Sequence, residues 1–125
     1  NALGSVDEDV FIRTSDTLGK RLGGASCVVE DPRLDDVGEW VRCVRIDDVL
    51  PRHRRVSVVH LDVEGFEDRV IEGAYETISR WRPVLIIEDP AVCGGDSGRI
   101  DELLGGLSYI SSGRVDANYV FVSIE

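Results

Sequence analysis

The feature that most constrains this chain is a strand-helix-strand pattern between residues 56 and 87. The stretch "VSVVHL", 56–61, is almost continuously apolar, which is typical of a parallel strand covered on both faces and lying centrally in a sheet. A helix is predicted from about Gly65 to Arg80, before Pro83 stops it. Its apolar face is given by residues at helical spacing, Phe66, Val70, Ile71, Ala74 and Ile78. With the second apolar run at 84–87, the pattern predicts a βαβ unit with two parallel strands.

The residues before this unit are less regular. A β-rich run from Val10 to Thr14 predicts a strand, and "WVRCVRI", 40–46, predicts another. Between them, residues 16–38 are rich in Gly, Asp and Ser without periodicity, so we expect a long surface connection there.

The residues after the unit predict a helix and a hairpin. Apolar side chains recur at helical spacing at Ile100, Leu103, Leu104 and Leu107. The closing stretch predicts two antiparallel strands around a turn at 113–118, on the edge of the sheet. We therefore expect an α/β fold in a single domain, residues 1–125, with a parallel βαβ unit and a C-terminal antiparallel hairpin.

Charge and composition exclude several kinds of partner. The chain has 125 residues and a formal net charge of −10, which disfavours binding to nucleic-acid phosphates. No apolar run approaches the roughly 20 residues of a membrane span, so we expect no membrane partner either. The basic stretch "PRHRR", 51–55, is interpreted as a solvated turn before a strand.

The cysteines indicate the compartment. Cys27, Cys43 and Cys93 are odd in number and contain no CxxC pair, so the sequence suggests neither a disulfide framework nor a zinc site. We expect a cytoplasmic protein.

Acidic side chains follow both predicted parallel strands. Asp62 and Glu88 come at the carboxyl ends of those strands, at the edge where open α/β sheets bind their ligands. Glu64 and Glu67 belong to the start of the following helix. A structural role also fits, because Asp62 could be a helix N-cap and Glu67 could complement the helix dipole. His60 could be a base or an ordinary strand histidine.

Two other sites remain open from the residues alone. The glycine-rich "CGGDSG", 93–98, could bind phosphate, but it matches no complete phosphate-binding motif and is better interpreted as a flexible loop or substrate lid. A carboxylate-metal site built from Asp62, Glu88 and Asp89 could hold Mg²⁺ for hydrolysis. We assign no metal ligand, and a metal site is the less favoured interpretation of these carboxylates.

The central block resembles a known family. "IDDVL" followed by "VSVVHLDVEGFEDRVIEGAYETISRWRPVLIIE" closely resembles the C-terminal half of FkbM-like S-adenosylmethionine-dependent methyltransferases, and "NALGS" looks like that family's "ALgd" segment. The matching positions are Asp47, Asp48, Asp62, Glu64, Gly65, Glu67, Gly73, Ala74, Pro83 and Glu88.

The resemblance implies a partial Rossmann-like methyltransferase sheet and S-adenosylmethionine as cofactor. It implies O-methyl transfer to a small-molecule or sugar hydroxyl, with Asp62 and Glu88 as catalytic residues and His60 as an alternative base. Substrate-binding residues would be Glu64, Gly65, Glu67 and Asp89.

Two departures from the family pattern shape the expectation. His60 stands where the family usually has a lysine, and residues 1–55 contain no counterpart of its glycine-rich donor loop. We therefore expect a truncated C-terminal portion that is inactive alone; the alternative is a non-enzymatic remnant or self-associating fragment. Such a sheet would either form a homodimer through its exposed edge or be covered by its own N-terminal segment.

Overall fold

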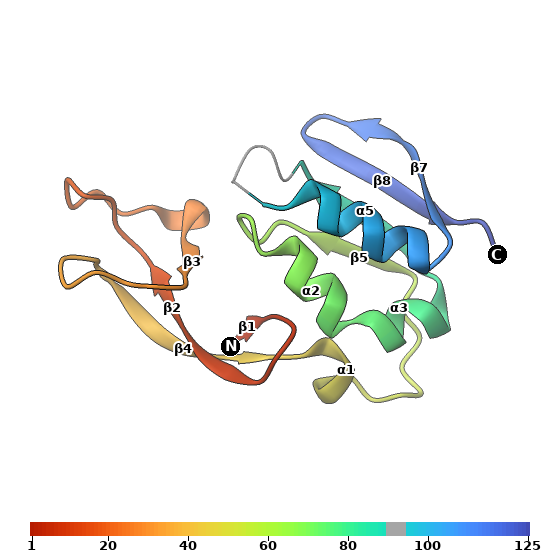
Figure 1. The fold of residues 1–125 in the computed structure, drawn as a ribbon, viewed down its shortest axis with the longest axis horizontal. Coiled ribbons are helices and arrows are strands. Elements are labelled where there is room, and N and C mark those ends of the chain that lie inside the picture. Colours follow the sequence, from red (N-terminus) through yellow and green to blue (C-terminus); the bar gives the residue numbers. More distant parts are fainter. Residues whose placement is uncertain (90–94) are drawn as a thin grey trace.

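The computed structural model describes residues 1–89 and 95–125, which form a mixed α/β structure with two four-stranded sheets (Figure 1). None of the described helices has the length and apolarity needed to cross a bilayer. The elements in chain order are β1 (Ala2–Leu3), β2 (Glu8–Arg13), the 3₁₀ turn η1 (Gly23–Ala25), β3 (Cys27–Val29), β4 (Gly38–Val44), α1 (Ile46–Val49), β5 (Val58–Leu61), α2 (Glu67–Gly73), α3 (Tyr75–Trp81), β6 (Val84–Glu88), α5 (Ser97–Gly106), β7 (Tyr109–Val115) and β8 (Asn118–Ser123).

The second sheet contains the predicted βαβ unit and hairpin. Its strand order is β5-β6-β8-β7, with β5 parallel to β6 and the other pairs antiparallel. Both predictions are confirmed, including the place of the hairpin at the sheet edge. The predicted turn is too wide, because β7 runs on to Val115 and Gly113 lies at an irregularity within the pairing. The turn itself is Asp116 and Ala117, and Asp116 has a positive φ of 52°.

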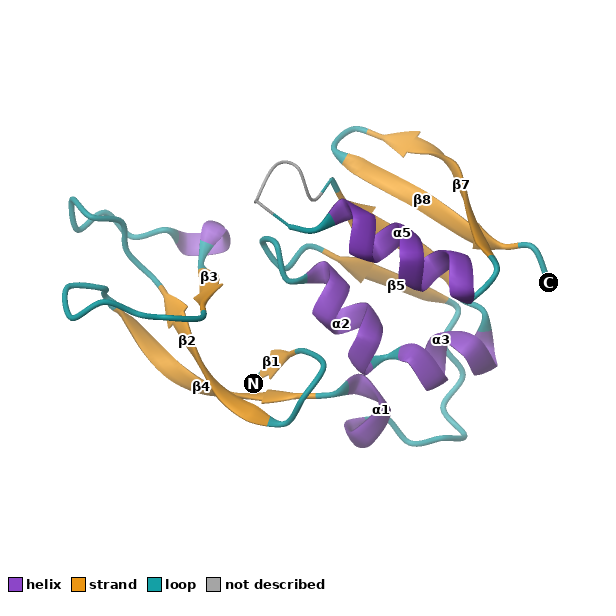
Figure 2. Ribbon diagram, in the orientation of Figure 1, coloured by secondary structure: helices purple, strands orange, loops and turns teal. Residues whose placement is uncertain are grey.

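The main hydrophobic core lies between this sheet and the helices α2, α3 and α5, which cover one of its faces (Figure 2). Ile71, Ile78 and Leu85 are completely buried there. They come from the predicted helical face and the predicted strand, so the apolar face of the helix packs against the sheet as expected. The buried hydroxyl of Tyr109 donates to the carbonyl of Pro83 at 2.7 Å, which satisfies the one polar atom of that ring.

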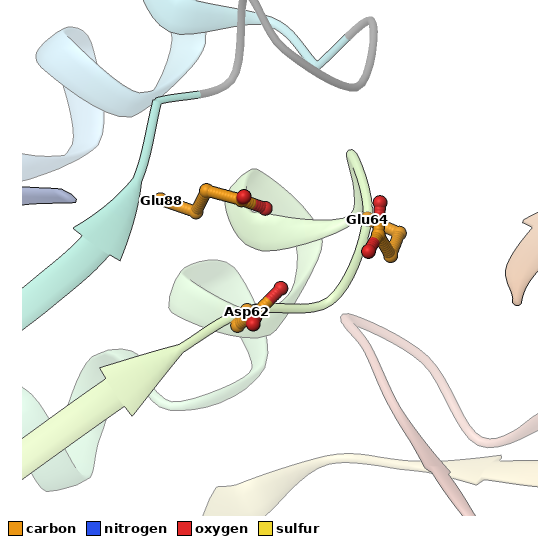
Figure 3. Close-up of side chains that lie close together, drawn as sticks. All are labelled: Asp62, Glu64 and Glu88. Atoms are coloured by element: carbon orange, nitrogen blue, oxygen red, sulfur yellow. The ribbon is translucent and has the colours of Figure 1, made fainter. Parts of the chain in front are cut away.

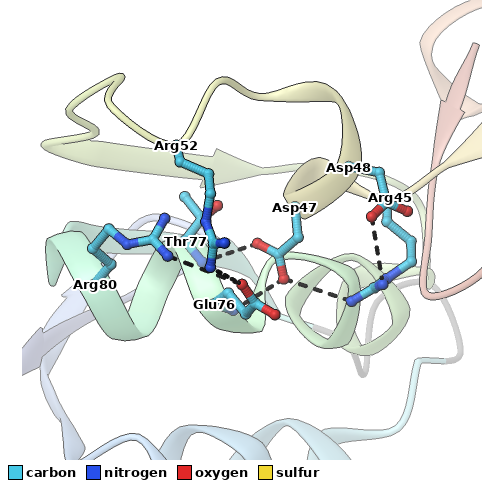
Figure 4. Close-up of polar contacts among 7 residues, drawn as sticks. All are labelled: Arg45, Asp47, Asp48, Arg52, Glu76, Thr77 and Arg80. Atoms are coloured by element: carbon cyan, nitrogen blue, oxygen red, sulfur yellow. Dashed lines mark hydrogen bonds and ion pairs between the residues drawn. The ribbon is translucent and has the colours of Figure 1, made fainter.

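The predicted single helix is two helices, so that expectation was wrong. The chain breaks at Ala74, where φ is −111° between α2 and α3. Asp47, on α1, supplies the cap that starts α3: its carboxylate accepts from the backbone N–H of Glu76 at 3.0 Å and of Thr77 at 2.9 Å (Figure 4). A carboxylate from another element therefore replaces the cap that a local residue would give.

The first sheet contains a strand that the sequence did not predict. Its order is β1-β4-β2-β3, and β3 falls within residues 16–38, which were expected to be irregular. Cross-strand pairing with β2 stabilises this short apolar stretch, which carries no period of its own. β4 ends at Val44 rather than at residue 46, because Ile46 begins α1.

This first sheet has few buried side chains. Val10, Phe11 and Cys43 are its buried apolar residues, and Trp40 packs edge-on against Phe11 with ring centroids 5.5 Å apart. Ion pairs such as Arg42 with Asp7, at 2.6 Å, lie on its surface. Exposed ion pairs contribute little to the stability of a fold.

The two sheets meet where β1 passes over α2. The chain at Gly4 approaches Gly73 so closely that a Cβ on Gly73 would lie 1.8 Å from the Gly4 carbonyl oxygen. An ion pair between Arg69 on α2 and Glu30, just after β3, forms a second bridge. Gly73 is therefore needed for contact between the sheets.

The strand predicted to lie centrally is an edge strand in this structure. Among the described strands, β5 pairs only with β6, and Val58 is 55% exposed. The N-terminal segment does not pair with this edge, so it does not cover it as one of our two alternatives proposed. The other alternative, a second copy, remains a prediction.

Candidate functional site

Three carboxylates meet at the carboxyl ends of β5 and β6. Asp62 and Glu64 follow β5, and Glu88 is the last residue of β6 (Figure 3). One carboxylate oxygen of each lies within 4.8 Å of the others. Parallel strands end at the same edge of a sheet, so the βαβ unit itself brings Asp62 and Glu88 together.

A tight turn brings in Glu64. Glu64 and Gly65 both have left-handed backbone conformations, with φ of 55° and 91°. Glycine adopts this conformation without penalty, whereas a glutamate needs support from its surroundings. The turn folds the chain back after β5 and places Glu64 beside Asp62.

Glu67 supplies that support from inside. Its side chain is only 1% exposed, and one oxygen accepts from the N–H of Val63 at 3.0 Å and of Gly65 at 3.4 Å. The other oxygen, Oε2, has no hydrogen-bond partner among the described residues. Glu67 therefore holds the turn in place and has almost no surface for a substrate.

The charges of the cluster change the pKa of Glu88. Partial burial raises the pKa of Glu88, and the charge of Asp62 and a hydrogen bond with it raise that pKa further. The charges of Glu64 and Glu67 act in the same direction. All of these effects favour the protonated form of Glu88 over its carboxylate.

A pocket of about 430 Å³ lies between the start of α5 and the strands β6, β7 and β8, and none of the three clustered carboxylates lines it. Its apolar surface comes from Ile87, Ile100 and Phe121, and its polar groups come from Asp89, Ser97, Asp101, Ser111 and Tyr119. Asp89 pairs with Arg114 at 3.3 Å. A small molecule with an apolar face and polar edges would suit such a lining.

A second pocket, of about 450 Å³, is lined in part by the Glu64 turn. It lies between the first sheet and α2, and its lining includes Cys27, Glu30, Glu64, Arg69 and Asp96. Of these two pockets, the second is the one whose lining includes a member of the carboxylate cluster, Glu64.

The predicted site residues are only partly brought together. His60 is exposed on β5, two residues before Asp62, and does not belong to the carboxylate cluster. Asp89 faces the first pocket. The metal alternative named Asp62, Glu88 and Asp89, but the group that the structure brings together has Glu64 in place of Asp89. Carboxylate oxygens are the ligand type that hard cations prefer, but three of them are fewer than the six or more ligands that such ions take.

The glycine-rich stretch 93–98 lies partly outside the described residues, since Cys93 and Gly94 fall in the gap. The part that is described begins α5, whose N-cap Asp96 accepts from the N–H of Arg99 at 3.0 Å.

Sequence reasoning named Glu64 as a site residue but did not predict the turn that positions it, and it missed Arg114 and Tyr119 altogether. Glu64 was assigned to substrate binding or helix support, although Gly65 beside it signals a left-handed turn that redirects the chain. Arg114 and Tyr119 were not considered, because only the pairing of β8 with β6 brings the hairpin to the first pocket. No local motif marks them.

Comparison with protein families gives one clear result. The model of the methyltransferase FkbM domain matches residues 22–110. Comparisons with curated proteins and with solved structures found no match. The matched region includes the carboxylate cluster, α1 to α5 and most of the first pocket's lining.

Proposed function

Since the chain belongs to the methyltransferase FkbM family, we propose that it takes part in S-adenosylmethionine-dependent methyl transfer to a hydroxyl group, with the carboxylate cluster at the reacting hydroxyl. The observation that carries this proposal is the meeting of Asp62, Glu64 and Glu88 at the carboxyl edge of a βαβ unit. The parallel pair followed by a hairpin supports a portion of a Rossmann-like sheet.

The chemistry of the cluster fits the donor in one respect. S-adenosylmethionine, when bound, supplies a methyl group activated by a positively charged sulfur, and it also carries an ammonium group. Asp62 and Glu64 are the described carboxylates that could balance such a cation.

Asp62 is proposed as the group that accepts the proton lost by the hydroxyl. It is exposed at the end of β5, and a protonated Glu88 that donates to it would hold its carboxylate in one orientation. Glu67 keeps the turn after Asp62 fixed, so the proton acceptor keeps its place in the cluster.

The acceptor is proposed to be a small molecule or a sugar. Ile87, Ile100 and Phe121 offer an apolar floor, while Asp89 and Ser111 offer oxygen atoms to further hydroxyl groups. Asp89 directly follows Glu88 in the chain, and the acceptor is proposed to extend from this pocket toward the cluster. A cytoplasmic location is part of the proposal and is supported by the free thiols of Cys27 and Cys43.

Two measurements test this function. Calorimetric titration of the chain with S-adenosylhomocysteine should show binding, and a folded sample without binding would limit the chain to a non-catalytic role. Transfer of a tritiated methyl group to a panel of sugars and small alcohols should then fall about 10²- to 10⁴-fold in Asp62→Asn. Asp48→Asn, an exposed acid on α1, is the matched control. Full turnover in Asp62→Asn would remove Asp62 from the chemistry.

A further inference from the structure

The first pocket, between α5 and the strands β6, β7 and β8, has the size and the apolar base of a site for a small organic molecule. Its volume is about 430 Å³, and the buried side chains Ile87, Ile100 and Phe121 belong to its lining. Tyr119 adds a second ring, whose centroid lies 6.4 Å from that of Phe121. A ring the size of a monosaccharide can pack its apolar face on such side chains, whereas a bare metal ion could not fill this space.

The charges around this pocket do not balance. Asp89 and Asp101 both line it, and its described lining contains no lysine, arginine or histidine. Arg114 on β7 contacts two of the lining residues. It lies 3.3 Å from the carboxylate of Asp89 and donates to the hydroxyl of Tyr119 at 3.3 Å. Arg114 therefore balances the charge of Asp89, one of the two carboxylates.

The other carboxylate, Asp101, has no such counter-charge. Asp101 lies exposed on α5 and forms no ion pair within residues 1–89 and 95–125. The arginine nearest to it in sequence, Arg99, pairs instead with Glu72 at 3.1 Å and with Glu102 at 3.0 Å. Water solvates Asp101 while the pocket is empty. A ligand that displaces this water gains most when it offers a positive charge in return.

We propose that the acceptor of the methyl transfer carries a protonated amine, as an amino sugar does, and that Asp101 binds this amine in the first pocket. The inference rests on the proposed function for the role of the ligand as acceptor, but the binding of the amine needs no methyl donor. Ser97 and Ser111 offer oxygen atoms to the hydroxyl groups of the same molecule. The unbalanced charge also disfavours sugars that carry a carboxylate or a phosphate.

The first experiment compares three sugars that share one ring and differ in charge: glucosamine, glucose and glucuronic acid. Nitrogen-15 NMR titration of the purified chain at about pH 6.5, where the amine is protonated, follows the backbone signals of Ile100 and Ser111. Glucosamine should bind about tenfold more tightly than glucose, and glucuronate more weakly than glucose. Equal affinity for glucosamine and glucose would overturn the proposal, because the carboxylates would then serve hydroxyl groups alone. The absence of any shift with about 100 mM glucosamine would also overturn it.

The second experiment locates the charge that binds the amine. The net charge of −10 attracts any amine to the chain, so the variants must remove equal charges from different places. Asp101→Asn should weaken glucosamine binding about tenfold and leave glucose binding unchanged. Glu102→Gln removes the same charge from the next residue of α5, which does not line the pocket, and should retain the preference for glucosamine. Loss of the preference in both variants, or in neither, would overturn the assignment to Asp101.

The position of the NMR shifts and the absence of a methyl donor make the remaining outcomes distinct. Shifts centred on Cys27 and Phe66 would place the amine in the second pocket and overturn the proposal. A chain that binds glucosamine through Asp101 but transfers no methyl group would contradict the proposed function and keep the amine site. A chain that methylates glucose and glucosamine equally well would keep the transfer and overturn the amine site.

Discussion

The two sheets of this protein have the same number of strands but are stabilised in different ways. The second sheet buries one face under three helices, and Ile71, Ile78 and Leu85 lie in a continuous core. The first sheet has only Val10, Phe11 and Cys43 buried, and Trp40 remains 63% exposed. Burial of apolar surface is the main favourable term in folding. The second sheet with its helices is therefore the stable unit, and the first sheet depends on contact with it.

The carboxylate cluster belongs to the stable unit. Asp62 follows β5 and Glu88 ends β6, both strands of the second sheet, and Glu67 on α2 accepts from the backbone N–H of Val63, next to Asp62. The first sheet contributes only one wall of the second pocket, through residues such as Cys27 and Glu30. A site on rigid elements keeps its geometry, whereas a wall on a weakly packed sheet can adjust.

The largest expected effect comes from the core of the second sheet. Ile71→Ala removes a fully buried side chain and should lower the free energy of unfolding by about 2–5 kcal/mol, because it leaves a cavity among well-packed residues. Chemical denaturation measures the loss. Ile110→Ala makes the same change at a half-exposed position of β7 and should cost less than about 1 kcal/mol. Equal losses would contradict the contrast between core and edge.

The next effect separates the two sheets. Gly73→Ala places a methyl group against the Gly4 carbonyl oxygen, so β1 must move away from α2. We expect a loss of about 1–3 kcal/mol, with faster amide exchange in the first sheet than in the second.

Gly105→Ala is the control for Gly73→Ala. Gly105 lies within α5 and its added Cβ meets open space. This change should stabilise the chain by about 0.5–1 kcal/mol. A neutral result for Gly73→Ala would mean that the contact between the sheets contributes little.

A smaller effect should follow from the cap of α3. Asp47→Ala removes the acceptor for two backbone N–H groups and should cost about 0.5–2 kcal/mol, while Asp47→Asn, which keeps an oxygen, should cost less. Thermal unfolding provides the measurement. Asp48→Ala removes an exposed neighbour whose ion pair with Arg45 spans 3.6 Å, and it should change stability by less than about 0.5 kcal/mol. If both substitutions cost the same, Asp47 is not a specific cap.

The smallest expected effect is dependent on pH. Folding raises the pKa of Glu88. The protonated side chain therefore contributes its full stability to the folded state below the ordinary glutamate pKa of about 4.3, and this contribution is lost as pH rises through the folded-state pKa. Glu88→Gln removes the repelled charge and should raise the melting temperature at pH 7, with the gain disappearing below about pH 4. Glu39→Gln, on the first sheet, makes the same change away from the cluster. A gain that is independent of pH would contradict this account of Glu88.

Much of the second sheet could be predicted from the sequence. The continuous apolar runs at 56–61 and 84–87 and the helical spacing between them are local signals, and parallel pairing follows from the connection. The meeting of Asp62 and Glu88 follows from the same rule. The break at Ala74 could not be predicted, because it depends on Asp47 from α1 and on the approach of Gly4 to Gly73.

The sequence by itself determined the βαβ unit, the hairpin and the acidic edge, because each depends on the local period of apolar residues and on the order of elements along the chain. Only the tertiary structure decided that β3 forms, that Glu64 joins the cluster and that Asp89 faces the neighbouring pocket. These features depend on contacts between residues distant in the sequence or on a left-handed turn held by buried Glu67, and no local pattern specifies such contacts.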